Sequence, residues 1–102
     1  MKENRIDLDI KLLRDRRADA SERADAARRL ARSRAQGALE ALIAVAEEPD
    51  ADEGLARAAG ESVAKMVIRT GKLDKAPLHD FSDCAYLAYD ETMSRHLRSA
   101  SA

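Results

Sequence analysis

The side chains best suited to chemistry gather in one short segment, which contains His79, Asp80, Asp83 and Cys84. His79 and Asp83 are four positions apart and would share a helix face, but two ligands do not complete a zinc site. A catalytic Cys84 would need a histidine held by a third group, and no such arrangement is indicated. A thiol near an apolar stripe commonly packs as a small apolar side chain. We therefore expect no metal site and no cysteine catalysis.

Other catalytic signals are also missing from the sequence. The four glycines do not form a phosphate-binding loop. Carboxylates are abundant, but a general acid needs a cleft that shifts its pKa, and a thin layer of helices rarely makes one. We expect a protein that is not an enzyme and has no cofactor.

The composition predicts helices as the elements that position these side chains. Of 102 residues, 21 are alanine and only three are aromatic. Alanine, leucine, arginine and glutamate favour helices, whereas the β-branched and aromatic residues that favour sheets are scarce. The chain length supports one domain with a modest core. The predicted fold class is all-α.

Capping signals and apolar spacing delimit five helices in this sequence. Three segments have the form of a capping box, in which an oxygen-bearing residue precedes Glu or Gln by three positions; they are 19–22, 33–36 and 50–53. Pro49 is expected to end the third helix, and Gly71 the fourth. Asp74 can cap the fifth helix, with Pro77 in its first turn. Short connections predict that sequential helices are antiparallel neighbours.

An internal repeat links the second and fourth helices. Residues 26–31 align with residues 59–64, an offset of 33. The helix after each block carries a similar apolar set, at Leu39, Leu42 and Ala46 and then at Leu78, Phe81 and Ala85. Gly60 falls inside the second block beside Ala59, where close helix packing explains it better than a ligand.

This pattern resembles HEAT and armadillo repeats, whose first helices carry small residues around a Leu or Val. The resemblance implies about five helices stacked as a short α-α superhelix, and a compact five-helix bundle is the alternative. The implied organisation is one domain over 1–102, with a capping helix at 5–18, helix pairs at 19–48 and 50–98, and a tail at 99–102.

A narrower resemblance rests on residues 55–64 followed by Gly71-Lys72-Leu73-Asp74. These segments are similar to short bacterial HEAT-like proteins of the immunity type, which neutralise a toxin encoded beside them. That resemblance implies a protein partner, often a cationic nuclease domain, which is bound and blocked stoichiometrically.

Charge is unevenly distributed along the chain. Residues 1–34 have a net charge of +4 and residues 35–102 a net charge of −5. Such a dipole can steer an oppositely charged partner, although surface charge also serves solubility alone. An apolar anchor, an amphipathic aromatic side chain and a charged rim are typical of a protein-binding patch. The candidate partner-binding residues with this character are Asp80, Asp83, Tyr86, Leu87, Asp90, Glu91, Glu47 and Glu48.

Several alternatives stay open at this point. The chain could be a structural or regulatory adaptor that oligomerises, although we favour a monomer. Nucleic acid binding through the arginine-rich second helix is disfavoured, because acidic residues interleave and no aromatic side chain in that half can stack on bases. A single cysteine and the lack of a signal-like or membrane-spanning apolar run predict a cytoplasmic protein.

Overall fold

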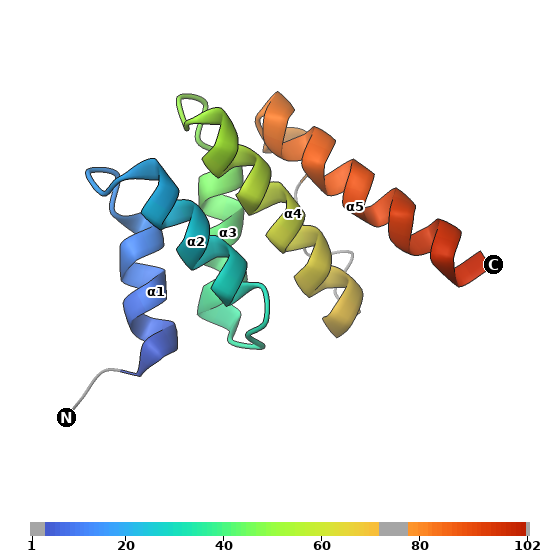
Figure 1. Ribbon diagram of the computed structural model, residues 1–102, viewed down its shortest axis with the longest axis horizontal. Helices are drawn as coiled ribbons and strands as arrows, with labels where there is room; N and C mark the ends of the chain where they lie inside the picture. Colours follow the sequence, from blue (N-terminus) through green and yellow to red (C-terminus); the bar gives the residue numbers. More distant parts are fainter. Residues whose placement is uncertain (1–3, 72–77, 102) are drawn as a thin grey trace.

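The first four helices run alternately up and down, so each is antiparallel to the next (Figure 1). The computed structural model describes residues 4–71 and 78–101, apart from the side chains of residues 36, 79, 100 and 101. The described residues contain five α-helices and no strand, which confirms the all-α prediction. The elements are α1 (Arg5–Arg14), α2 (Ala20–Leu30), α3 (Gln36–Ala46), α4 (Glu53–Thr70), the 3-10 helix η2 (Leu78–Asp80) and α5 (Asp83–Ser101).

Helix α5 departs from this alternation. It packs on α4 and runs in the same direction, so α2, α4 and α5 form a row with α5 at its end (Figure 1). The connection between Gly71 and Ser82 is long enough to return the chain to the level at which α4 starts. The expectation that all sequential helices are antiparallel is therefore corrected for the last pair. As a result, α5 does not repeat the position of α3.

The start of α5 also differs from the sequence prediction. Residues Asp74 and Pro77, which were expected to open this helix, lie outside the described residues. The Oγ of Ser82 accepts the N–H of Ala85 at 3.3 Å, which is the capping interaction of α5. The N–H of Ser82 donates to the carbonyl of Ala46 at 2.8 Å. This bond fixes the start of α5 at the C-terminal end of α3.

The other helix ends confirm some capping predictions and shift others. Gly71 ends α4 with φ = 74°, the left-handed conformation that glycine adopts easily. At the start of α4 the cap is Asp52, whose side chain accepts the N–H groups of Gly54 and Leu55. The box predicted from Asp50 is therefore wrong by two residues. The N-cap of helix α3 is similarly Ala35, two residues after the predicted cap Ser33.

The apolar and glycine positions of the repeat are buried in both helices, and α2 packs on α4. They are Ala26, Ala27 and Leu30 in α2 with Ala31 at its C-terminal cap, and Ala59, Gly60, Val63 and Ala64 in α4. Small side chains at these positions allow two helix backbones to approach closely. At Gly60 the approach is extreme, because an added Cβ would lie 2.0 Å from the backbone oxygen of Ala85. The expectation that Gly60 serves close helix packing is confirmed.

Two arginines of α2 hold the N-terminal half together through ion pairs that sequence spacing did not reveal. Arg23 is only 4% exposed, donates to the carbonyl of Leu13 at 2.9 Å and pairs with Glu48 at 2.8 Å. Arg29 donates to both carboxylate oxygens of buried Asp9 at 2.8–3.1 Å. The hydrogen bond that Arg29 donates to Asp9 is the main reason that the pKa of Arg29 is raised. These contacts join α2 to α1 and to the end of α3.

Helix α5 buries only part of the apolar stripe that helical spacing predicts from the sequence. That predicted stripe consists of Leu78, Phe81, Ala85, Ala88, Thr92 and His96, and is extended by Met93 and Leu97. Ala85, Ala88 and Tyr89 are buried, and the ring of Tyr89 meets that of Phe81 edge to face, with centroids 6.1 Å apart. The prediction that the stripe continues through His96 and Leu97 is wrong, because both side chains are exposed. Figure 1 shows the last turns of α5 extending away from the other helices.

Burial of Tyr89 predicts a loss of stability at alkaline pH. Burial raises the pKa of the Tyr89 phenol, with a smaller contribution from Tyr86. The unfolded chain therefore loses this proton first, and the stability contributed by the neutral phenol falls as the pH rises above about 10. Thermal denaturation near pH 9 and near pH 11 should show that the melting temperature falls less between these two pH values for Tyr89→Phe than for the unmodified chain. Exposed Tyr86→Phe is the control, and equal losses in all three proteins would contradict the assignment.

Candidate protein-binding surface

The outward side of α5 carries apolar and acidic side chains together. Asp83, Leu87 and Asp90 follow one another at spacings of four and three residues, which places them on one helix face. This face is opposite the buried Ala85 and Ala88. Tyr86, Leu87 and their acidic neighbours are exposed, with Tyr86 at 44% and Leu87 at 54%. We call Asp83, Tyr86, Leu87, Asp90 and Glu91 the α5 surface.

The carboxylates of the α5 surface are accessible to a partner. Asp83 and Asp90 are exposed. Glu91 lies 3.7 Å from Arg57, and both side chains are about half exposed, so this pair is weak and easily exchanged. The first turn of α5 contains Asp83, where an acid complements the helix dipole. Asp90 and Glu91 lie in the middle of the helix, beyond the reach of that effect.

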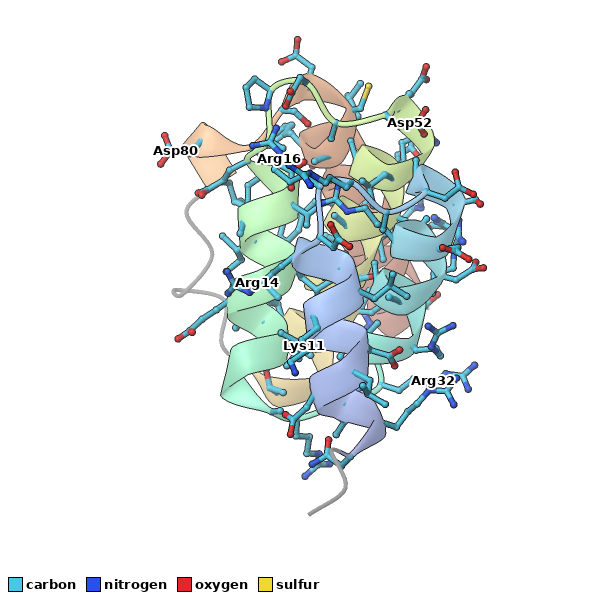
Figure 2. The ribbon with its side chains drawn as sticks, turned by 90° about the vertical axis from the view of Figure 1, so that its left-hand side faces the viewer. Lys11, Arg14, Arg16, Arg32, Asp52 and Asp80 are labelled. Carbon is cyan, nitrogen blue, oxygen red and sulfur yellow. The ribbon has the colours of Figure 1, made fainter. Side chains whose placement is uncertain are left out.

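The other candidate partner-binding residues lie at the C-terminal end of α3 and in η2. Asp80 is exposed on η2, and Figure 2 shows its side chain pointing away from the helices. The bond between Ser82 and Ala46 brings the end of α3 to the start of α5. Glu47, the residue after Ala46, is half-buried there. Asp80 and Glu47 therefore belong to the same end of the molecule as Asp83.

Glu48 has a different role from the one that the sequence suggested. Its carboxylate pairs with buried Arg23 at 2.8 Å and lies 3.8 Å from Arg16. An acid held by two arginines of its own chain serves the fold, and we leave Glu48 out of the α5 surface. The sequence could not distinguish it from Glu47, because its partner Arg23 is 25 positions away.

Basic and apolar groups continue along α5 beyond the predicted patch. All three acidic residues of α5 precede both of its basic residues, Arg95 and Arg98. Leu97 lies between the two arginines and is 58% exposed. The exposed charges of α5 thus change from acidic to basic along the helix, with an exposed leucine in each half. Arg95, seven positions after Ala88, lies at the edge of the outward side. The sequence did not indicate this continuation, because helical spacing places Leu97 on the predicted apolar stripe.

The arginine-rich half offers fewer free cations than its sequence suggests. Figure 2 shows the α1 end, where the labelled Lys11, Arg14 and Arg32 point outward. Within residues 4–34, however, five arginines have carboxylate partners: Arg5 and Arg29 with Asp9, Arg16 with Asp50, Arg23 with Glu48, and Arg28 with Asp25. Local pairing of this kind weakens the field that attracts a phosphate backbone.

Three hollows that the described residues form are open to solvent. An open groove of about 400 Å³ lies between the N-terminal ends of α2 and α4, lined by Asp19, Asp25, Arg28 and Asp52 among others. Among the side chains that the structure describes, to which His79 does not belong, no three of His, Cys, Asp or Glu are placed to hold a metal ion. No described helix combines the length and apolar character needed to cross a membrane.

Comparisons of this chain with protein-family models, with curated proteins and with solved structures found no match.

Proposed function

We propose that this chain is a protein-binding module that uses the α5 surface to bind a basic partner protein. The observation that carries the proposal is the exposure of Tyr86 and Leu87 beside three acidic residues at the free end of the helix row. No described helix covers the outward side of α5, since its main packing partner is α4. A leucine and a tyrosine in this position can bury apolar area on binding.

The charges around these two side chains favour a cationic partner. Asp83, Asp90 and Glu91 form an acidic rim, which steers a basic protein toward the site and raises its association rate. The apolar side chains then contribute to the lifetime of the complex by excluding water. Binding of this kind is stoichiometric and blocks whatever part of the partner it covers.

The biological setting that we propose is neutralisation of a toxin. The resemblance of residues 55–64 and 71–74 to immunity-type proteins supports this setting, and a cationic toxin domain has the charge that the α5 surface favours. The exposed position of α5 at the end of the helix row supports the proposal that the α5 surface is the binding site. A self-assembling adaptor is the second candidate, favoured by the basic half of α5.

Reversing two charges of the α5 surface tests the proposed function. We expect Asp83→Lys combined with Asp90→Lys to lower the association rate by about tenfold or more at low salt and to remove most of its salt dependence. We expect the gene directly upstream to encode a large secreted protein with a toxin-like C-terminal domain. That domain is the ligand for this test, with binding measured by stopped-flow fluorescence at two salt concentrations.

The matched control changes the net charge by the same amount, but at the other end of the molecule. Asp7 and Glu22 are exposed acids in the first turns of α1 and α2, as Asp83 is in α5. Asp7→Lys combined with Glu22→Lys should leave the association rate within about twofold. Equal effects of the two double variants would show that only net charge matters, and unchanged binding of the first would reject the α5 surface.

A further inference from the structure

We propose that two copies of this chain pair through the outward sides of their α5 helices, in antiparallel orientation, and thereby cover the α5 surface until a partner displaces the second copy. The pairing follows from the distribution of charged and apolar groups along one helix. The suggestion that pairing regulates partner binding rests on the proposed function. The pairing itself can be measured without any partner.

The charge order along α5 selects the antiparallel orientation. Asp83, Asp90 and Glu91 occupy the first half, whereas Arg95 and Arg98 occupy the second. A parallel pair would place acids against acids and bases against bases. An antiparallel pair places each acidic half against the basic half of the other copy. The helix dipole favours acids in the first turn and bases in the last, but it does not explain Asp90 and Glu91 in the middle.

The exposed leucines fit the same orientation. Leu87 and Leu97, the two leucines of α5, are ten positions apart on its outward side and are 54% and 58% exposed. An antiparallel pair centred between them brings Leu87 of each copy against Leu97 of the other. The leucine contacts are centred on position 92 of each helix. Glu91 of each copy faces Arg95 of the other when the centre is position 93, one residue away. Both contacts occur twice, as the two-fold symmetry of an isologous dimer requires.

The length of the surface suits a modest interface. Helix α5 has 19 residues, which corresponds to about 28 Å at 1.5 Å per residue. One pair of helices with four leucines and salt-sensitive charge contacts is typical of a weak dimer. We therefore expect a monomer in dilute solution and a dimer in concentrated solution.

Two single charge reversals test the orientation directly. In Glu91→Lys the pair would place lysine against Arg95 twice, and in Arg95→Glu it would place glutamate against Glu91 twice. Each variant alone should dimerise at least about tenfold more weakly than the unmodified chain. When the two variants are mixed, both contacts become attractive again, and a mixed dimer should form with an affinity close to that of the unmodified chain.

Sedimentation equilibrium of the full chain over a concentration series, at low and moderate salt, measures all four cases. The leucine contact is tested by Leu87→Ser, with Leu8→Ser on α1 as the control, since Leu8 is similarly exposed at 49%. We expect weaker dimers from Leu87→Ser and no change from Leu8→Ser.

A chain that stays at 11.2 kDa up to about 1 mM would overturn the pairing. So would single variants that dimerise like the unmodified chain, or a mixture that does not recover. A loss caused by Leu8→Ser instead would place the interface at α1. None of these outcomes affects the test with the toxin domain, so failure of the pairing and failure of the proposed function are distinguishable.

Discussion

Gly60→Ala is expected to destabilise the protein by about 3 kcal/mol or more. The new Cβ would lie 2.0 Å from the backbone oxygen and 2.9 Å from the Cα of Ala85, and backbone atoms cannot move aside as a flexible side chain can. Relief therefore requires α5 to separate from α4, which exposes the buried Ala85, Ala88 and Tyr89. Urea denaturation measures the loss, and the melting temperature should fall by on the order of 10 °C or more.

The same substitution in α3 is the matched control. A Cβ on Gly37 would meet only the Cδ1 of Ile10, at an ordinary 3.5 Å. Alanine has a higher helix propensity than glycine, so Gly37→Ala should leave the stability unchanged or raise it by up to about 1 kcal/mol. Equal stability changes in the two variants would show that the helices do not approach as closely at Gly60 as the structure indicates.

Arg23→Met is expected to cost about 3–5 kcal/mol of stability. The guanidinium is buried and donates to Leu13 and to Glu48. Methionine fills similar space but leaves the Leu13 carbonyl without this donor and the Glu48 carboxylate without its nearest cation. Denaturant unfolding monitored by circular dichroism gives the change in free energy.

Two further variants separate a buried ion pair from a general effect of losing arginine. Arg28→Met removes a pair with Asp25 in which both side chains are mostly exposed, so a change below about 1 kcal/mol is expected. Combining Arg23→Met with Glu48→Met removes both charges and should recover a large part of the loss. A cost below about 1 kcal/mol for Arg23→Met alone would contradict the role assigned to this pair.

The local features of the fold were the most predictable from the sequence. Periodicity and composition predicted five helices, and the 33-residue repeat correctly identified Gly60 as a packing position. Capping residues were harder to choose, because Asp50 and Asp52 both carry suitable oxygens. The choice between them depends on where the chain enters α4, which the tertiary structure decides.

The long-range features could not be predicted from spacing. Arg23 meets Glu48 across 25 positions, and no local pattern distinguishes it from the exposed arginines around it. The direction of α5 depends on the connection after Gly71, in which Asp74 and Pro77 suggested a helix start. Leu97 has the helical spacing of a core residue, yet α5 projects beyond the helices that could cover it.

The candidate site was predicted in part. The acidic and apolar side chains of the α5 surface are exposed together, on the face opposite Ala85. In a HEAT-like stack this helix would be a second helix and would lie on the inner side, whereas α5 continues the row of α2 and α4. Exposure of the α5 surface therefore results from its position at the end of the row.

Site-specific photo-cross-linking in living cells tests most directly whether the α5 surface is the interaction surface. The photoreactive residue p-benzoylphenylalanine would replace Leu87 in one variant and Leu8, at the opposite end of the molecule, in the other. We expect the variant at position 87 to form adducts either with a basic protein or with a second copy of the chain. Mass spectrometry identifies the cross-linked protein, and the sequence of a basic partner should give an isoelectric point above about 9. Adducts from position 8 with none from position 87 would contradict the account.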